Sequence, residues 1–312
     1  MFKKILVPLD GSPEAEQALG VAGALAHAGA AELLLLRTVQ PVYAPLPVAG
    51  GLPNEFEWPW PQPAGAERQQ EARDYLAAVA RRHECDGCVV HTRSYEGDPA
   101  GVIVDTAADD AVDLLVMSAH GRAGKRRAIF GNVTERVLHS ATCPVLLTRT
   151  ADPIRRILVA LDGSPLGERA LSPALTVARA LGAQVVLLRV NDQMPLNPLE
   201  VSLVWEWEPG PSDWQAVEEL RRTAETYLRD AAARHGLGSN EGQRLVLDGA
   251  PADRIQEYAR LSAIDLIAMS THGRTGLRRW LFGSVTSQVM RGTDGAMLIV
   301  RPPEEALREG KQ

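Results

Sequence analysis

The chain is short of several features that would place it in a specialised class. It has only three cysteines among 312 residues, which fits a reducing compartment better than a disulfide-stabilised fold. Its apolar runs stay below the roughly 18 residues that a transmembrane helix needs. Residues 1–10 enter a strand pattern directly, with no secretory leader. We therefore expect a cytoplasmic protein without a membrane partner.

Positive charge is also scarce. The formal net charge is −6, and in neither half of the chain do Lys and Arg outnumber Asp and Glu. Binding to a nucleic-acid backbone requires a concentrated positive face, so we expect no nucleic-acid partner. The length and the 45% apolar content allow two cores of ordinary size.

Two of the cysteines belong to a pattern that could bind metal. It offers four possible zinc ligands within nine residues: His83, Cys85, Cys88 and His91. A single Cys-x-x-Cys is weak evidence without a well-spaced second pair, and the second half of the chain keeps only His235 of the four. We predict no metal site, and we interpret Cys143 as a buried small hydrophobic residue.

The chain contains two copies of one domain. Residues 5–13 and 157–165 align at an offset of 152, and the same offset holds at His120-Gly-Arg and His272-Gly-Arg. A period this long indicates a duplicated domain, because solenoid repeats run about 20–50 residues. We predict domains over 1–150 and 153–303, joined at a short polar stretch, and a C-terminal tail over 304–312.

Each copy alternates short apolar strands with helical patterns, which is typical of a parallel α/β sheet. We expect strands at 4–9, 33–36, 89–94, 114–118, 145–148, 156–161, 185–190, 244–247, 266–270 and 296–301. Helices are expected at 13–29, 67–82, 99–109, 133–140, 165–181, 214–235, 251–262 and 284–291, with Ser12 capping the first and Pro13 as its first residue. The predicted fold class is α/β: two doubly wound, Rossmann-like domains, each with a five-stranded parallel sheet.

Each copy also carries a long insert between its second strand and second helix, at 41–65 and 193–213. Four of the six tryptophans lie in these inserts: Trp58, Trp60, Trp205 and Trp207. Loops of this length are uncommon unless they are functional. Two interpretations stay open: aromatic plugs over the domain itself, and a lid or cross-domain contact.

A glycine-bearing loop follows the fourth strand of each copy. In the second copy Ser270-x-x-Gly273 is followed by nine residues and then Gly283-Ser284; the first copy has Ser118-x-x-Gly121, nine residues and Gly131-Asn132. A strand, a glycine loop and a helix N-terminus together form an anion site, because unpaired N–H groups and the helix dipole converge there. Phosphate is the expected ligand.

This pattern resembles that of the ATP-binding branch of the universal stress protein family, Gly-x-x-Gly, nine residues, Gly-Ser/Thr. Ser270 and Ser118 depart from the family's first glycine, and Asn132 departs from its Ser or Thr. The resemblance implies an adenine nucleotide alpha-hydrolase-like fold and an ATP or other adenine-nucleotide ligand, with Mg²⁺ held by the phosphates as an open alternative.

The resemblance also implies roles for individual residues. Asp162 would bind the ribose and the backbone at Val190 the adenine, while Gly273, Gly283, Ser284 and Val285 would hold the phosphates, with Arg274 a candidate to reach them. The matching residues in the first copy are Asp10, Thr38, Gly121, Gly131, Asn132 and Val133. An Asp-Gly-Ser-Pro sequence favours a turn by itself, so a purely local role for Asp10 and Asp162 stays open. We expect the second site to be the stronger, since it keeps a serine that can cap the helix and donate to phosphate.

Family members commonly dimerise through their last strands, so the resemblance implies an internal pseudo-dimer. Strands 145–148 and 297–301 would pair, each covering the other's edge, about a pseudo-twofold axis. A further homodimer is left open.

The leading hypothesis is a nucleotide-binding, stress-response regulatory protein whose ligand state changes its shape or its binding of an unidentified protein partner. One alternative is a slow adenine-nucleotide hydrolase or transferase; another is a ligand-free scaffold. No P-loop occurs in the sequence, and neither His120 nor His272 has a nucleophile or metal-ligand set beside it. We therefore predict no catalytic residues.

Overall fold

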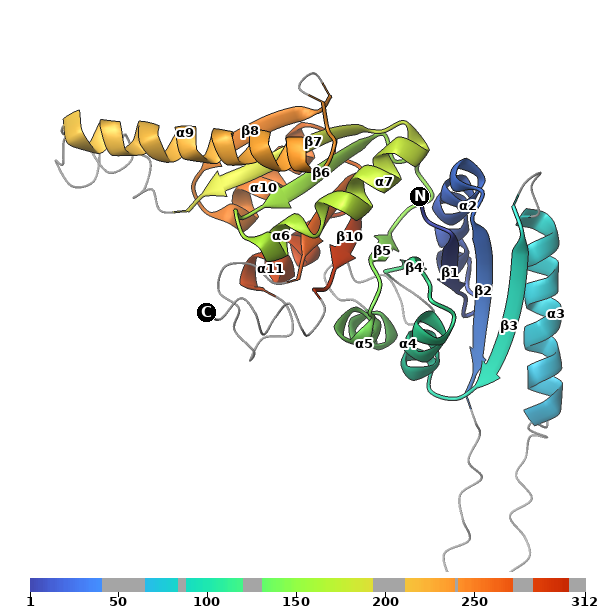
Figure 1. Ribbon diagram of the computed structural model, residues 1–312. Coiled ribbons are helices and arrows are strands. Elements are labelled where there is room, and N and C mark those ends of the chain that lie inside the picture. Colours follow the sequence, from blue (N-terminus) through green and yellow to red (C-terminus); the bar gives the residue numbers. More distant parts are fainter. Residues whose placement is uncertain are drawn as a thin grey trace, which may run out of the picture.

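The computed structural model describes residues 1–40, 65–83, 88–119, 131–192, 211–238, 241–271 and 283–302. Within these ranges ten strands form one sheet in the order β3-β2-β1-β4-β5-β10-β9-β6-β7-β8. Figure 1 shows the two halves of the chain meeting at β5 and β10, with helices on both faces of the sheet.

The elements of the first half are β1 (Lys4–Pro8), α1 (Pro13–Glu16), α2 (Ala18–Gly29), β2 (Glu32–Val39), α3 (Gly65–His83), β3 (Val90–Glu96), α4 (Pro99–Asp109), β4 (Leu114–Ser118), α5 (Asn132–Ser140) and β5 (Val145–Thr148). Those of the second half are β6 (Arg156–Leu161), α6 (Pro165–Glu168), α7 (Leu171–Leu181), β7 (Gln184–Asn191), α9 (Pro211–Arg234), β8 (Gln243–Asp248), α10 (Pro251–Leu261), β9 (Leu266–Ser270), α11 (Ser284–Gly292) and β10 (Ala296–Val300). Residues 41–64 and 193–210, which include the four tryptophans of the inserts, lie outside the described residues, as do His120 and His272. The inserts end earlier than predicted, because Gly65 and residues 211–213 belong to α3 and α9.

The predicted doubly wound topology is confirmed. β1 pairs in parallel with β2 on one side and with β4 on the other, and β6 pairs in the same way with β7 and β9. The direction of winding reverses between these neighbours, and ligands of such sheets bind beyond the carboxyl ends of the strands at that point.

Both faces of the sheet are buried, because successive side chains along a strand point to opposite faces. Ile5 and Val7 belong to the core beneath α2, α3, α7 and α9, whereas Leu6 belongs to the core beneath α4, α5, α10 and α11. All of residues 33–36 are buried. This strand is therefore covered on both faces of the sheet.

The first helix of each half differs from its prediction. Ser12 caps it and Pro13 is its first residue, as expected, but the expected single helix is divided into α1 and α2 at Gln17. The amide of Gln17 donates to Glu14 O at 3.3 Å, and in the second half Arg169 N donates to Leu166 O at 3.3 Å. Such i to i−3 bonds are those of a 3₁₀ turn, which is common at helix ends.

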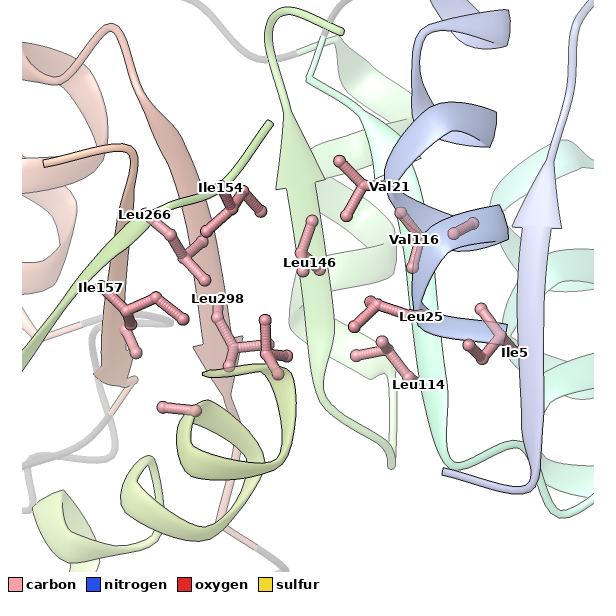
Figure 2. Packing of buried hydrophobic residues seen from close by; sticks show 14 of the residues in the cluster. Ile5, Val21, Leu25, Leu114, Val116, Leu146, Ile154, Ile157, Leu266 and Leu298 are labelled. Carbon is pink, nitrogen blue, oxygen red and sulfur yellow. The ribbon is translucent and has the colours of Figure 1, made fainter. Parts of the chain in front are cut away.

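β5 and β10 pair antiparallel, which confirms the predicted contact between the last strands. The register places Leu298 opposite Leu146, Met297 opposite Leu147 and Ile299 opposite Val145. Leu146 and Leu298 are related by the offset of 152, so each lies opposite its own counterpart, as a twofold axis through that pair requires. In Figure 2 Leu146 and Leu298 lie between the two halves, with Val21 and Leu25 of α2 beyond Leu146.

Two arginines at equivalent positions cross this junction in opposite directions. Arg149 Nη2 donates to Met290 O, in α11, at 3.0 Å, and Arg301 Nη1 donates to His139 O, in α5. Both acceptors lie in the last turn of their helix, where backbone carbonyls lack intrahelical partners and attract cations. Each domain therefore caps the helix that follows the other domain's glycine loop.

The cysteines that the structure describes lie in structural positions. Cys143 is buried, as predicted, and burial raises the pKa of its thiol to about 11. Cys88 Sγ lies 3.8 Å from Ala31 O, while Cys85 falls outside the described residues. Among the helices that the structure describes, none combines the length and apolar character needed to cross a bilayer.

Candidate functional site

A crevice of about 230 Å³ lies at the carboxyl ends of β6, β7 and β9, beside the start of α11. We call it the second-domain crevice. It brings together six of the residues indicated by the sequence: Asp162, Val190, Ser270, Gly283, Ser284 and Val285. Gly273 and Arg274 lie outside the described residues. These six residues lie in or next to β6, β7, β9 and α11. They line one crevice although they are separated by up to 123 positions in the sequence.

Asp162 follows β6 and organises the turn into α6. Its Oδ1 accepts from Ser164 N at 2.9 Å and from Ser164 Oγ at 2.7 Å, and Ser164 Oγ accepts from Gly167 N at 3.0 Å. This is the local turn that the Asp-Gly-Ser-Pro sequence favours. Because Asp162 also lines the crevice, the turn holds a carboxylate at its wall in a defined orientation.

The absence of a side chain at Gly167 leaves room for the Asp162 carboxylate. A Cβ at Gly167 would come within 2.3 Å of Asp162 Oδ1, and Gly167 itself lines the crevice. The first copy has Ala15 at this place. Sequence analysis missed Gly167, although self-alignment of the chain shows the alanine-to-glycine difference.

Ser270 ends β9 at the wall of the crevice. Its side chain is 7% exposed, and its Oγ is buried without a hydrogen-bond partner among the described residues. Buried hydroxyls are normally paired, because an unmade hydrogen bond costs the desolvation of the group, about 1–3 kcal/mol. The Ser270 hydroxyl, at the position where the family pattern has glycine, is therefore available to hydrogen-bond a ligand.

The start of α11 is anchored to the end of β9 by backbone acceptors. Gly283 N donates to Thr271 O at 2.7 Å, and Thr286 Oγ1 donates to Ser270 O at 3.0 Å. The N-cap residue is Gly283, so the prediction that Ser284 caps this helix is wrong; Ser284 is its first residue. A helix capped by glycine has no side-chain acceptor from its N-cap for the first N–H groups, which suits an anion in that place.

The backbone conformation of Gly283 does not require a glycine. Its φ is −57° and its ψ is 149°, a conformation open to any residue. Space is the constraint instead, because a Cβ at Gly283 would lie 3.3 Å from Thr271 O and 4.0 Å from Thr286 Oγ1.

The first domain repeats the frame with different side chains. Asp10 Oδ1 accepts from Ser12 N at 2.9 Å and from Ser12 Oγ at 2.5 Å. Thr38 lies within β2 and Ser118 ends β4, while Gly131 caps α5, whose first residues are Asn132 and Val133. Gly121 lies outside the described residues. As in the second domain, the residue after the glycine is not the cap.

Charge at the helix start separates the two domains. Glu135 lies in the first turn of α5, whereas the first turn of α11 has no acidic residue and has Ser287 at the equivalent place. Arg136 does not offset this charge, since it bonds both oxygens of Asp98 at 2.7 and 2.8 Å and holds the pKa of that carboxyl below its usual value. An anion at the start of α5 would meet a negative charge that is missing from α11.

Other residues that line the second-domain crevice were not anticipated, among them Asp192, Pro251 and Ile255. Asp192 directly follows β7, and the other two come from α10. α10 covers the opposite face of the sheet from α7. The ends of the strands do not indicate which helix residues close the hollow.

The geometry defines a tandem α/β protein with a crevice at the topological switch point of its second domain. The chain belongs to the Universal stress protein family, whose profile matches residues 1–149 and again 153–301. The two matches agree with the duplication read from the sequence.

Relatives match either the whole chain or one half of it. A universal stress protein of Mycolicibacterium smegmatis is 26% identical over 307 residues, covering 96% of this chain and 97% of that protein. Universal stress protein MJ0531 of Methanocaldococcus jannaschii is 36% identical over 149 residues, covering 48% of this chain and 83% of that protein.

Solved structures share the tandem fold. Protein PA1789 of Pseudomonas aeruginosa superposes with a TM-score of 0.69 at 19% identity, covering 99% of this chain and 95% of that one. A universal stress protein of Archaeoglobus fulgidus gives a TM-score of 0.66 at 19% identity, with coverages of 96% and 98%. At this level of identity the likeness concerns the fold.

Proposed function

We propose that the second-domain crevice binds an adenine nucleotide, with ATP as the preferred ligand, and that the protein acts as a nucleotide-dependent regulator in the stress response. The observation that carries the proposal is the meeting of Asp162, Ser270 and the glycine-capped start of α11 in one hollow. The phosphate oxygens would accept hydrogen bonds from the N–H groups in the first turn of α11, and a ribose hydroxyl would donate to the Asp162 carboxylate.

The direct test is to identify what the protein carries and what it binds. Small molecules released from the purified, denatured chain would be identified by mass spectrometry, and the ligand-free protein would be titrated with ATP, ADP and adenosine, with and without Mg²⁺. We expect saturable binding that strengthens with each added phosphate. Absence of binding by all three would leave the ligand-free scaffold as the better account.

The role of Asp162 can be tested without removing its charge. In Gly167→Ala the new methyl group must displace the Asp162 carboxylate, so we expect ATP to bind more weakly. Asp162→Ala should also weaken ATP binding, by about 1–3 kcal/mol. Ala15→Gly in the first domain is the matched control, because Asp10 keeps the same hydrogen bonds to Ser12 there with alanine in place. Equal affinity of Gly167→Ala and the unmodified protein in calorimetry would restrict Asp162 to its turn.

The two domains should bind ATP unequally, the second more tightly. Asn132 is bulkier than Ser284, and Glu135 adds a negative charge at the start of α5. We expect Glu135→Ser and Asn132→Ser each to strengthen the weaker site, and Ser284→Asn to weaken the stronger one, each by up to about 1 kcal/mol, the scale of a charge near a helix terminus. If a two-site titration shows no change in any of the three variants, the inequality does not arise at the helix start.

A further inference from the structure

The second-domain crevice runs across three neighbouring strands. β9, β6 and β7 lie side by side in the sheet in that order, and each contributes to the lining, with Ser270 at β9, Asp162 at β6 and Val190 at β7. The start of α11 is bonded to the end of β9, whereas Pro251 and Ile255 of α10 line the crevice beside β7. The crevice therefore has one end at the start of α11 and the other between β7 and α10.

This order decides where each part of a bound nucleotide would lie. With the phosphates at the start of α11 and the ribose at Asp162, the base falls between β7 and α10. We call that part of the crevice the base end and define it by Leu188, Val190, Asp192, Pro251 and Ile255. Apolar walls with a few polar groups that fix orientation are usual in small-molecule sites, and they suit the flat faces of a purine.

Asp192 is the charged residue of the base end. Successive residues of a strand point to alternate faces, and Leu188 and Val190 belong to the face of the sheet that α10 covers. Asp192 follows two residues after Val190, directly beyond β7, and lines the crevice with them. Of the lining residues that the structure describes, Asp162 and Asp192 are the charged ones, and Asp162 lies at β6, away from the base end.

The arginines nearest in the fold have other partners. Arg254, in the first turn of α10, pairs with Glu257 at 2.8 Å and donates to Asp248 O at 3.0 Å. Arg221 of α9 pairs with the Asp248 carboxylate at 2.7 Å. Among the residues that the structure describes, no hydrogen bond or ion pair involves the Asp192 side chain.

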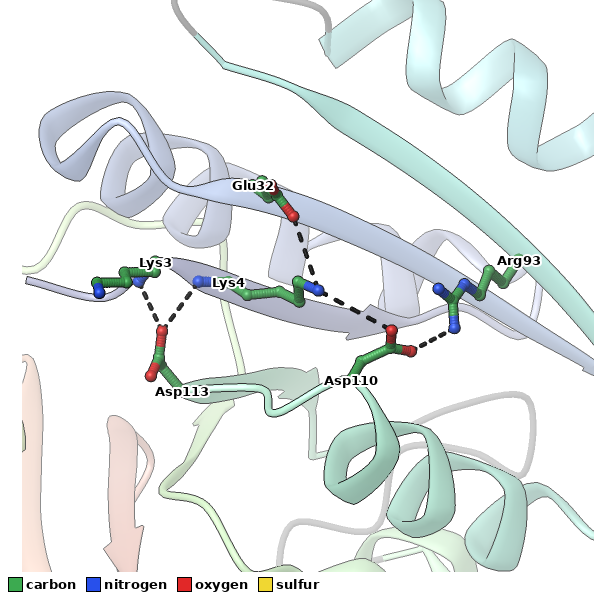
Figure 3. Close-up of polar contacts among 6 residues, drawn as sticks. All are labelled: Lys3, Lys4, Glu32, Arg93, Asp110 and Asp113. Atoms are coloured by element: carbon green, nitrogen blue, oxygen red, sulfur yellow. Dashed lines mark hydrogen bonds and ion pairs between the residues drawn. The ribbon is translucent and has the colours of Figure 1, made fainter.

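Carboxylates at another strand end show the contrast. In Figure 3, Asp113 Oδ2 accepts from Lys3 N at 2.7 Å and from Lys4 N at 3.0 Å, and Asp110 Oδ1 lies 3.9 Å from Lys4 Nζ. These carboxylates, in the segment that leads into β4, hold the strands of the first domain together. Asp192 has no such structural task within the described residues and faces a crevice instead.

A carboxylate at the base end distinguishes purines by what they carry at position 6. An ionised carboxylate accepts hydrogen bonds and donates none. Adenine has an amino group there, which donates, whereas guanine has a carbonyl oxygen, which accepts. A carboxylate facing this position gains a hydrogen bond with adenine and meets a lone pair with a 6-oxopurine. Sites built to hydrogen-bond a ligand group reject analogues that leave the site's polar group unpaired.

We propose that Asp192 selects adenine in the second-domain crevice by accepting a hydrogen bond from the 6-amino group of the base. This role rests on the nucleotide site proposed above and adds the residue that determines its base specificity. In the first domain Gln40 takes the equivalent place at the offset of 152. Its side-chain amide holds both a donor and an acceptor, so Gln40 can bond to an amino group or to a carbonyl oxygen and does not separate the two.

The test compares ATP with inosine triphosphate (ITP), in which a carbonyl oxygen replaces the 6-amino group, in calorimetric titrations of the full chain. We expect the tight site to bind ATP at least about tenfold more tightly than ITP, a difference of about 1.4 kcal/mol. Asp192→Gln gives the second domain the residue that the first domain already has. It should lower the preference to about threefold or less, because the amide can turn its donor to the carbonyl oxygen, and it should melt like the unmodified protein.

Two controls separate base selection from nucleotide binding. Asp162→Ala should weaken ATP and ITP by the same factor, because the two ligands share their ribose, and Gln40→Asp should leave the preference of the tight site unchanged. If ATP binds but the preference is absent, or is the same in Asp192→Gln, the role of Asp192 is overturned while the nucleotide site stands. If neither nucleotide binds saturably, the site and the role of Asp192 are both wrong.

Discussion

Replacing Gly283 with valine is expected to abolish ATP binding in the second domain while the chain stays folded. The new Cβ would lie 3.3 Å from Thr271 O, and the branched side chain would stand at the start of α11, where the phosphates are proposed to bind. Backbone strain is not the reason, since valine tolerates the φ of −57° found there. Loss of one charge-assisted hydrogen bond costs about 1.5–3 kcal/mol, so losing two would weaken binding by more than about a hundredfold.

The matched control for this prediction is Gly131→Val. Gly131 caps α5 as Gly283 caps α11, but a Cβ there meets nothing closer than Thr134 Oγ1 at 3.9 Å. We expect the first substitution to remove the tight site in a calorimetric titration and the second to spare it. Unchanged affinity in Gly283→Val would exclude Gly283 from the site, and loss of the tight site in Gly131→Val alone would move that site to the first domain. Thermal melting of both variants checks that the fold is retained.

The strands and their pairing could be predicted from the sequence because they depend on patterns that repeat. Short apolar runs bounded by polar residues marked β1, β4, β6 and β9, and the offset of 152 carried each assignment from one half to the other. Pairing of β5 with β10 followed from the family resemblance together with the duplication, since a twofold relation brings a strand against its own counterpart.

Details that depend on three-dimensional neighbours could not be predicted. The division between α1 and α2 arises from hydrogen bonds of i to i−3 type at Gln17, and no residue there marks a break. The residue that caps α11 is set by the hydrogen bond that Gly283 N donates to Thr271 O. The role of Gly167 can be recognised only from the position of the Asp162 carboxylate.

The candidate site was predictable in its parts and less so in its chemistry. The sequence indicated which residues gather at the carboxyl ends of the strands, because parallel strands end at one edge of their sheet. It did not indicate that the hydroxyl of Ser270 is buried without a partner in the described part of the chain. Burial decides this, and burial can be read only from the packed structure.

Truncating the junction pair Leu146 and Leu298 should give the largest loss of stability. Both side chains are 0% exposed and lie opposite each other where the two five-stranded sheets join. Removing a buried leucine side chain costs about 2–5 kcal/mol, and a domain's total stability is only about 5–15 kcal/mol. We therefore expect Leu146→Ala and Leu298→Ala each to lower the urea midpoint strongly, with the two domains unfolding in separate transitions once their joint core is weakened.

The double variant shows whether the pair acts as one unit. Contacting residues usually show coupling energies of about 0.5–3 kcal/mol, whereas distant residues add independently, so the double variant should lose less than the sum of the single losses. Leu6→Ala and Leu158→Ala are the matched control, because these leucines are also fully buried and related by the duplication but lie in β1 and β6, on opposite sides of the junction. Their effects should add. Additive losses for Leu146 and Leu298 in urea unfolding followed by circular dichroism would mean that the domains are held together elsewhere, with the contact of α2 with α7 as the next candidate.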